Sequence, residues 1–368
     1  MTTARINKLR ELARAERMDY IAILPGSNLI YFANVHMHLS ERPTVALFPA
    51  DATRQPALIV PSFEVGKAKR YSPDVDWNIY AYADGQPYQS AFDDALKPLG
   101  SVTVGVEPEG MRFLELNMMR TAAPSAKFVS ADGVIKQMRM VKDAGEIAAM
   151  RKAIGISESA LADVLKTVKP GMTELQVARA LVEAGAKYGA DEGSFEPLVQ
   201  SGLNAAFPHD ASTKRAINSG DGLLMDFGFR ADGYPSDITR TVFVGEPSAE
   251  MRKIYEVVKA ANAAGRAAVK PGVTGQDVDR ATRKVIEDAG YGPYFTHRTG
   301  HGLGLDIHES PYIVEGNDVP LRPGNTFTIE PGIYIEGLGG VRIEDNMLVT
   351  ETGGESLTSF GRDLMVVG

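Results

Sequence analysis

The chain carries one structural unit twice. The segments KPGMTELQVARALVEAG (169–185) and KPGVTGQDVDRATRKVIEDAG (270–290) begin with the same Lys-Pro-Gly and lie 101 positions apart. In each segment a threonine is followed three residues later by Gln176 or Asp277, which predicts a capped helix start. Two copies of one unit predict two similar halves related by an internal two-fold axis, with equivalent residues brought to that axis.

Each copy of the unit is followed by a predicted β-hairpin that carries two acids. Asp226 and Asp237 lie in GLLMDFGFRADGYPSDITRT, and Glu330 and Glu344 lie in TFTIEPGIYIEGLGGVRIED. The turn sequences ADGY and EGLGG predict that the two acids of each hairpin are cross-strand neighbours. The equivalent acids are 104 and 107 positions apart, close to the offset of the repeat. An internal two-fold axis would therefore bring both pairs together.

Four carboxylates in one interior require compensating positive charge. An isolated acid on a strand is usually solvent-facing, but each of these acids stands in an apolar strand, where an unpaired charge is costly. Two divalent cations carry four positive charges, so the set predicts a dinuclear metal site. The chain has no cysteine, which leaves oxygen and imidazole donors, the set that suits manganese, cobalt or zinc.

Three of the six histidines lie in one glycine-rich segment between the hairpins, HRTGHGLGLDIHE, which contains His297, His301 and His308. A helical zinc motif is excluded because the glutamate between its histidines is missing and the glycines oppose a helix. A dinucleotide-binding fingerprint is excluded because no strand precedes the segment and its glycine spacing is incomplete. We expect a loop whose backbone approaches a metal closely, with His301 beside the acids.

The chain is long enough for two domains, which we place at residues 1–135 and 136–368. The first alternates predicted strands with predicted helices, which is typical of a small α/β domain; the strands are 20–25, 44–50, 57–62 and 102–108, and the helices are 6–16, 87–99 and 111–123. It has no dense cluster of acids or histidines, so we expect a role in specificity or assembly. The second begins near Val141 with a capping box at Asp143 and Glu146.

The overall charge and hydropathy exclude several classes of partner. The formal net charge is -8, so there is no positive field to attract nucleic acid or an anionic membrane. No stretch approaches about 18 consecutive apolar residues, and the N-terminus lacks an apolar signal core. We therefore expect a cytoplasmic protein with neither nucleic-acid nor membrane partners.

Six ordered segments resemble the pita-bread metallopeptidases, specifically the prolidases (Xaa-Pro dipeptidases) and aminopeptidases P. These segments are SGLNAAFPHD, LLMDFG, SDITRT, GHGLGLDIHE, TIEPGIY and VRIED, within residues 140–368. Residues 1–135 resemble the creatinase-type N-terminal domain of that family more loosely. The resemblance implies an α/β N-terminal domain followed by an α+β pita-bread domain with a pseudo-two-fold repeat, and a homodimer.

The resemblance also implies a role for each candidate site residue. It implies that two metal ions, commonly manganese or cobalt, are held with Asp237 and Glu344 bridging; the ligands are Asp226, Asp237, His301, Glu330 and Glu344. It implies that His209 and His308 hydrogen-bond the scissile carbonyl and the developing oxyanion, and that His297 lies at the substrate pocket. Glu330 is also the expected proton acceptor. His36 and His38 are weaker candidates, because lone histidines are more often structural or surface residues.

The expected function is metal-dependent hydrolysis of Xaa-Pro bonds at the N-terminus of dipeptides or short peptides. Proline has no N–H, so an apolar pocket must recognise it. Many prolidases have an arginine where this chain has Tyr312, which puts dipeptide-only specificity in doubt and favours an aminopeptidase P-like activity, unless Arg342 or an N-terminal arginine grips the carboxylate. The alternatives are a hydrolase of another amide, such as an N-acyl amino acid, and a non-catalytic binding module.

Overall fold

The computed structural model describes residues 2–368, which fold into two compact units that divide between Met138 and Arg139. Helix α6 (Asp132–Arg139) spans this division. The boundary that we placed after residue 135 therefore falls inside a helix rather than in a linker. Among residues 2–368, no helix is both long and apolar enough to cross a membrane.

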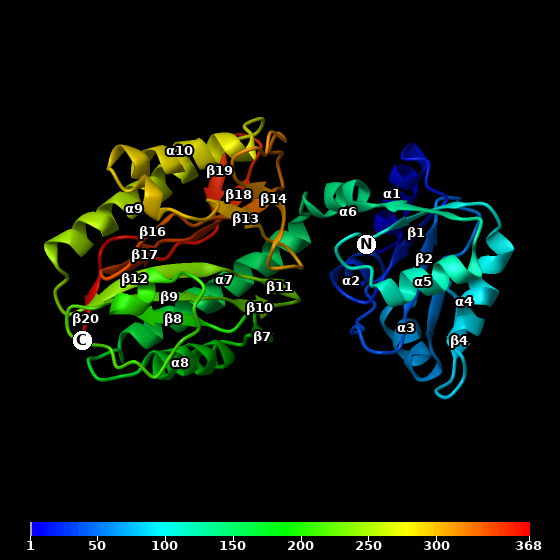
Figure 1. Cartoon of the computed structure of the whole chain (residues 1–368), viewed down its shortest axis with the longest axis horizontal. Coiled ribbons are helices and arrows are strands. Elements are labelled where there is room, and N and C mark those ends of the chain that lie inside the picture. The colour runs from blue at the N-terminus through cyan, green and yellow to red at the C-terminus, as the bar shows by residue number, and fades with distance from the viewer. Residues whose placement is uncertain (1) are drawn as a thin grey trace. The chain divides into compact units, whose positions relative to one another are not determined.

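The N-terminal unit is a six-stranded mixed sheet with helices against it (Figure 1). The strand order is β4-β3-β2-β1-β5-β6, with β1 antiparallel to β2 and parallel to β5. The strands are β1 (Tyr20–Ile23), β2 (Val45–Pro49), β3 (Ala57–Pro61), β4 (Asn78–Tyr82), β5 (Thr103–Val106) and β6 (Lys127–Ser130). The helices are α1 (Thr2–Ala15), α2 (Ser27–Ala33), α3 (Val65–Tyr71), α4 (Gln89–Leu96) and α5 (Phe113–Ala122), with 3-10 turns η1 (Ser62–Glu64) and η2 (Lys97–Leu99).

The four strands and three helices expected in this unit are present as β1, β2, β3, β5, α1, α4 and α5. The sequence pattern missed β4 and β6, which are the two edge strands. Most of their residues are only half-buried or exposed. An edge strand lacks the continuous apolar run that marks a buried strand, and this explains why both were missed.

The C-terminal unit contains the predicted repeat. Its helices are α7 (Ala144–Leu165), α8 (Glu174–Lys187), α9 (Ala249–Ala268) and α10 (Gly275–Asp288). The capping boxes predicted for α7, α8 and α10 are all formed. Gly171 and Gly272 precede α8 and α10 with φ of 89° and 86°, a left-handed conformation that favours glycine. Each donates its N–H to a carbonyl at 2.9 Å, that of Ile217 or Leu321, so the two copies share local geometry.

Each helix pair packs on its own set of strands, and in Figure 1 α9 and α10 lie on one side of the sheets while α8 lies on the other. The first half forms the sheets β12-β9-β8, to which the C-terminal strand β20 adds beside β12, and β11-β10-β7, and the second forms β14-β13-β15-β18-β19 and β16-β17. First-half strands are β7 (Glu192–Gly193), β8 (Leu198–Ser201), β9 (Gly222–Phe227), β10 (Phe229–Ala231), β11 (Tyr234–Pro235) and β12 (Ile238–Val244). The remaining strands are β13 (Gly300–Gly302), β14 (Glu309–Ile313), β15 (Thr326–Ile329), β16 (Gly332–Ile335), β17 (Gly339–Arg342), β18 (Asp345–Val349), β19 (Gly354–Ser356) and β20 (Val366–Val367), and the 3-10 turns are η3 (Gly202–Ala206) and η4 (Gly292–Tyr294).

Candidate metal centre

The two acid-bearing hairpins differ in register. In the second hairpin, Ile329 pairs with Asp345 and Gly332 pairs with Arg342, which places Glu330 opposite Glu344. In the first hairpin, Asp226 lies opposite Thr239, so it is offset by two positions from Asp237. The two pairs are therefore equivalent in their chain positions but not in their cross-strand partners.

His301 lies in strand β13, between β14 and β15, and not in the loop that the glycines predicted. The glycines serve strand packing, because a Cβ on Gly300 would lie 1.9 Å from the carbonyl oxygen of Thr328. The ring Nδ1 of His301 lies 3.1 Å from the carbonyl oxygen of Gly302 and donates to it. This hydrogen bond leaves the Nε2 lone pair free for a metal, the arrangement usual for histidine ligands.

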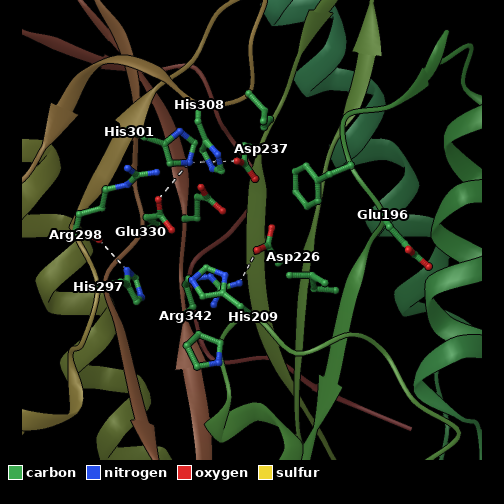
Figure 2. Close-up of a pocket in the computed structure, with 15 residues that line it drawn as sticks. Glu196, His209, Asp226, Asp237, His297, Arg298, His301, His308, Glu330 and Arg342 are labelled. Carbon is green, nitrogen blue, oxygen red and sulfur yellow. Dashed lines mark hydrogen bonds and ion pairs between the residues drawn. The ribbon is translucent and has the colours of Figure 1, made fainter. Parts of the chain in front are cut away.

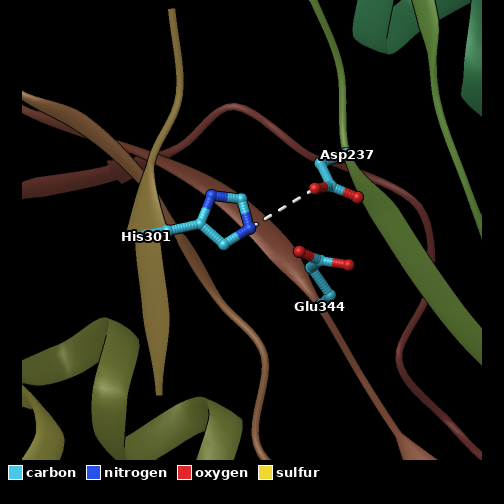
Figure 3. A group of neighbouring side chains, drawn as sticks. All are labelled: Asp237, His301 and Glu344. Carbon is cyan, nitrogen blue, oxygen red and sulfur yellow. Dashed lines mark ion pairs between the residues drawn. The ribbon is translucent and has the colours of Figure 1, made fainter. Parts of the chain in front are cut away.

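The structure brings all five predicted ligands into one cluster (Figure 2). Nε2 of His301 lies 3.3 Å from Oε1 of Glu330 and 3.5 Å from Oδ2 of Asp237. Ligand atoms of Asp237, His301 and Glu344 all lie within 4.8 Å of one another (Figure 3), and all three residues are buried. The fifth residue, Asp226, has a buried Oδ1 with no hydrogen-bond partner in the described chain.

Burial perturbs the protonation of the cluster. It raises the pKa of Glu330 to about 7 and raises those of Asp237 and Glu344 well above their ordinary values, and the neighbouring carboxylates add to the latter two shifts. Burial also lowers the pKa of His301, which keeps its imidazole neutral and able to ligate. Without cations these acids are therefore held in an environment that disfavours their charge.

One buried arginine accompanies the four acids. Arg342 donates from Nη2 to Asp226 at 2.5 Å, from Nη1 to the Tyr334 hydroxyl at 2.8 Å and from Nε to Thr239 Oγ1 at 3.1 Å. The Thr239 hydroxyl in turn donates to Glu344 at 2.7 Å. Four carboxylates thus face one guanidinium, and together with the unpartnered Asp226 oxygen this donor set fits divalent cations.

The residues that hydrogen-bond to the acids were not predicted from the sequence. A signal was present, because side chains two apart on a strand share a face. Thr239 stands two positions after Asp237, and Arg342 two positions before Glu344. We considered Arg342 only as a contact for substrate carboxylate, and its three hydrogen bonds commit it to the cluster instead. Tyr334 had no such signal, because it reaches the site from the separate strand pair β16-β17.

The three other candidate histidines surround the same cavity, which has a volume of about 570 Å³. The His308 ring lies edge-on to His301, with centroids 4.2 Å apart, and partial burial and repulsion by His301 lower its pKa to about 4. Burial lowers the pKa of His297 to about 3. His297 donates from Nδ1 to the Arg298 carbonyl at 2.7 Å, so its Nε2 accepts from the Tyr334 hydroxyl at 2.9 Å. His209 is exposed and lines the cavity from the segment after η3.

Acids on α8 and α10 hold the histidine-bearing segments. Glu174 is fully buried and accepts from the N–H groups of Ser201 and Thr213, at 2.7 and 2.9 Å, so it fixes both ends of the segment that carries His209. Asp279 accepts from the N–H of Thr299 at 3.2 Å, just before β13. The two halves therefore place their histidines by similar means.

The cavity also has an apolar wall, made by Phe195, Leu198, Pro208 and Ile307. The polar cluster and the apolar wall together suit a ligand with one hydrophobic and one polar part. His36 and His38 lie in the N-terminal unit, where both are exposed; His36 is hydrogen-bonded to Asn34. Among residues 2–368, neither histidine belongs to a group of possible metal ligands.

Comparison with known proteins identifies the family. The profile of "Metallopeptidase family M24" matches residues 148–351, and that of "Creatinase/Prolidase N-terminal domain" matches residues 5–141. The chain belongs to metallopeptidase family M24. It is therefore a metallopeptidase and a divalent-metal protein, and the predicted α/β N-terminal domain and pita-bread domain are confirmed.

Individual M24 relatives match nearly the whole chain. An Xaa-Pro dipeptidase of Lactobacillus helveticus is 34% identical over 368 residues, covering 98% of each chain. A prolidase from Thermococcus sibiricus superposes with a TM-score of 0.93 at 32% identity, covering 100% of this chain and 99% of its own. An X-Pro aminopeptidase from Thermotoga maritima superposes with a TM-score of 0.82 at 34% identity, covering 96% of this chain and 100% of its own.

Proposed function

We propose that the protein hydrolyses the peptide bond before proline at the N-terminus of Xaa-Pro dipeptides or short peptides, using two divalent metal ions, with manganese as the first candidate. The observation that carries the proposal is the convergence of the five predicted ligands at one cavity with an apolar wall. The names of the M24 relatives, which include an Xaa-Pro dipeptidase and a prolidase, support the substrate class.

The proposed ligands are the four acids and His301. They offer oxygen and imidazole donors, which suit manganese, cobalt or zinc. When bound, such ions supply Lewis acidity and lower the pKa of water at the site. Arg342 and Thr239 hold Asp226 and Glu344 in fixed orientations through their hydrogen bonds, which preorganises the set.

The remaining roles are assigned to side chains around the cluster. Glu330 is the proposed proton acceptor, because it borders the cavity and burial has already raised its pKa to about 7. It takes the proton of the attacking water and delivers it to the proline nitrogen as the C–N bond breaks. His308 and His209 line the cavity and are the proposed donors to the scissile carbonyl and the developing oxyanion. His297 is proposed to shape the substrate pocket.

Proline recognition is assigned to the apolar wall. The amide before proline has no N–H and the ring fixes φ, so an apolar surface must recognise the ring by shape. Phe195, Leu198 and Ile307 provide such a surface beside the polar cluster. A substrate with an ordinary residue in place of proline would leave its N–H without an acceptor against this wall.

The proposal is tested by adding Mn²⁺ and measuring turnover of Ala-Pro, Ala-Pro-Ala and an N-acetyl amino acid. Cleavage of a proline peptide supports it, cleavage of only the N-acetyl compound indicates an amide hydrolase of another kind, and no turnover with bound metal indicates a binding module. Asp226→Asn is expected to abolish nearly all turnover with the fold intact, whereas Asp232→Asn, at the exposed turn of the same hairpin, leaves it unchanged. An Asp226→Asn protein with native metal content and most of its activity would refute the ligand assignment.

A homodimer and a cytoplasmic location stay predictions, as does the absence of nucleic-acid and membrane partners. The homodimer rests on the resemblance to the family alone. Light scattering on the purified protein measures its mass in solution and tests it directly.

A further inference from the structure

The cavity contains an arginine that is not committed to the protein. Within residues 2–368, the guanidinium of Arg298 makes no hydrogen bond and no ion pair, although the side chain is half-buried and lines the cavity. Figure 2 shows it pointing toward Glu330 and His301. Arg342, the other arginine of the cavity, donates to three partners. Arg298 is therefore the guanidinium of the cavity that is free to bind an incoming group.

Arg298 is held in a defined orientation without using its donors. The guanidinium carbon lies 4.7 Å from the centroid of the Tyr312 ring. A guanidinium stacked on an aromatic face keeps its N–H groups in its own plane, where they are available to a planar acceptor. A carboxylate matches this arrangement, because its two oxygens can accept two parallel hydrogen bonds from one guanidinium.

The backbone on both sides of this pair is fixed. The Arg298 carbonyl accepts from His297, and the next residue, Thr299, donates its N–H to Asp279. Tyr312 lies in β14, which pairs with β13 directly after Arg298. Strand β14 and the segment that leads into β13 thus present the ring and the guanidinium together.

The contact between Arg298 and Tyr312 bears on the difference between this chain and many prolidases at position 312. Many prolidases carry an arginine at that position, whereas here a tyrosine stands there and the positive charge comes from Arg298, in the segment before β13. The loss of one arginine from β14 therefore does not remove a cation from this end of the cavity. The tyrosine at position 312 by itself suggests a lost cation, whereas Arg298 still lines the cavity.

We propose that Arg298, stacked on Tyr312, binds the free α-carboxylate of the substrate's proline and so selects dipeptides over longer peptides. This inference rests on the proposed Xaa-Pro hydrolysis and names the substrate class within it. In a dipeptide the α-carboxylate carbon is three bonds from the scissile carbonyl carbon. In a longer peptide a neutral amide stands there, which offers one acceptor oxygen and no charge.

The test compares Ala-Pro with Ala-Pro-amide, which differ only in that group, in the manganese-loaded full-length enzyme. The wild-type protein is expected to prefer the free acid by at least about tenfold in kcat/KM. Arg298→Met is expected to lower kcat/KM for Ala-Pro on the order of 100-fold, mainly through KM, because one partner of a charged pair is lost. The same variant is expected to change turnover of Ala-Pro-amide by less than about threefold, since the amide makes no such pair.

Further variants separate the two-pronged geometry of the Arg298 guanidinium from its positive charge and from the contribution of the Tyr312 ring. Arg298→Lys keeps the charge but not the two-pronged geometry, so an intermediate loss on Ala-Pro is expected. Tyr312→Phe keeps the stacking ring and is expected to act like the wild type, while Tyr312→Leu is expected to weaken Ala-Pro binding. Arg252→Met is the matched control, because Arg252 is an exposed residue of the same unit, paired with Glu246.

A binding measurement gives a readout that does not depend on turnover. Calorimetry with L-proline and L-prolinamide is expected to show that Arg298→Met weakens binding of proline and leaves that of prolinamide unchanged. Thermal unfolding and metal content report whether each variant is intact. If Arg298→Met does not fold, Arg298→Lys and the wild-type comparison of acid with amide decide the question.

The failures of the two proposals are distinguishable. If the loaded wild-type enzyme cleaves no proline peptide, the proposed function fails. If it cleaves Ala-Pro but treats the acid and the amide alike, or if Arg298→Met lowers both equally, the assignment of Arg298 is wrong and the proposed function stands.

Discussion

Asp237 and Glu344 are almost completely buried, and burial together with the neighbouring carboxylates raises the pKa of each. Glu330 follows the same trend, with a pKa of about 7. A metal ion that binds these residues must therefore displace protons at neutral pH. The residues proposed to hold the metal would thus link its affinity to pH.

Manganese is predicted to bind more tightly as the pH rises through about 7. The pKa of Glu330 is raised from its ordinary 4.5 to about 7, so in the metal-free fold its contribution to stability is complete below 4.5 and is lost as the pH rises through 7. At high pH a bound cation compensates the negative charge of Glu330. At low pH the cation has to displace the proton from the same carboxylate. Titration calorimetry in two buffers of different ionisation enthalpy measures the protons released. Affinity and proton release that do not change with pH would contradict the linkage.

Arg342→Met is predicted to destabilise the metal-free protein by about 3 kcal/mol, because removing one partner of a buried ion pair leaves the other without compensation. Asp226, Tyr334 and Thr239 each lose a donor in this variant. Urea unfolding followed by circular dichroism measures the change. The exposed Arg252→Met is the control and is expected to change stability by less than about 0.5 kcal/mol. Equal unfolding midpoints for the two variants would show that Arg342 does not support the cluster.

The sequence predicted the clustered acids better than the residues that support them. A carboxylate in an apolar strand is conspicuous, because nothing local explains it, and Asp226 and Glu330 both stand out in this way. An arginine such as Arg342 looks like an ordinary strand residue, and an arginine such as Arg298 looks like an ordinary loop residue. Their roles depend on what faces them across the fold, which no local pattern encodes.

At the scale of elements, the N-terminal ends of α8 and α10 anchor the segments that carry the site histidines. Glu174 is the clearest case, since one buried carboxylate accepts hydrogen bonds from Ser201, Asn204 and Thr213. The capping box fixes the start of α8 and with it the Glu174 carboxylate. This carboxylate in turn fixes the segment that carries His209. The position of His209 thus depends on a helix that does not itself border the cavity.

Glu174→Gln is predicted to lower kcat/KM for Ala-Pro about tenfold, because misplacing a group near the chemistry weakens transition-state contacts. An amide nitrogen cannot accept the hydrogen bonds that one carboxylate oxygen now accepts, which also costs about 2 kcal/mol of stability. Metal content is expected to stay native, since none of the proposed ligands contacts Glu174. Kinetics, urea unfolding and metal analysis measure the three effects.

Glu183→Gln is the matched control, with the same substitution at an exposed position of the same helix. It is expected to leave all three quantities unchanged. If Glu174→Gln behaves as this control does, the segment that carries His209 is positioned by other contacts.

Elements with a strong local signal were predictable, and those set by packing were not. The capping boxes of α7, α8 and α10 consist of neighbouring residues and formed as expected. Strand β13 was expected to be a loop, because its glycines have low strand propensity, yet they are needed for the close approach of β15. The register of the first hairpin is fixed by its turn, because Ala231 pairs with Tyr234 and the same register continues to Asp226 opposite Thr239.

At the scale of the whole molecule, duplication creates a catalytic unit whose halves meet at the metal cluster. An ion network behind the cluster joins them. Arg240 of β12, which is 2% exposed, donates to Asp345 of β18 at 2.8 Å and to the Glu344 carbonyl at 2.6 Å. Arg362 of the C-terminal segment donates to the same carboxylate at 2.7 Å. The sequence repeat predicted two halves but not this ion network, in which Arg240 and Asp345 are 105 residues apart.

Asp345→Asn is predicted to destabilise the C-terminal unit by about 3 kcal/mol at neutral pH, because it leaves the buried guanidinium of Arg240 and the half-buried one of Arg362 without their counter-charge. The change is isosteric, so packing is preserved. Burial opposes the charge of Asp345, but Arg240 and Arg362 outweigh it and lower its pKa below the ordinary 3.8. The stabilisation is therefore complete above that value and is lost as the pH falls below it. The difference between the wild type and the variant should accordingly shrink in acid.

Urea unfolding of the metal-free proteins at pH 7 and in acid measures this difference. Asp288→Asn is the control, because Asp288 forms an exposed pair with Lys284 on α10 and is expected to contribute less than about 0.5 kcal/mol. If the halves are joined through Asp345, manganese should also bind more weakly to Asp345→Asn, since Glu344 is its chain neighbour and contributes to the cluster. Native affinity in a destabilised variant would show that the ion network holds the fold without shaping the metal site.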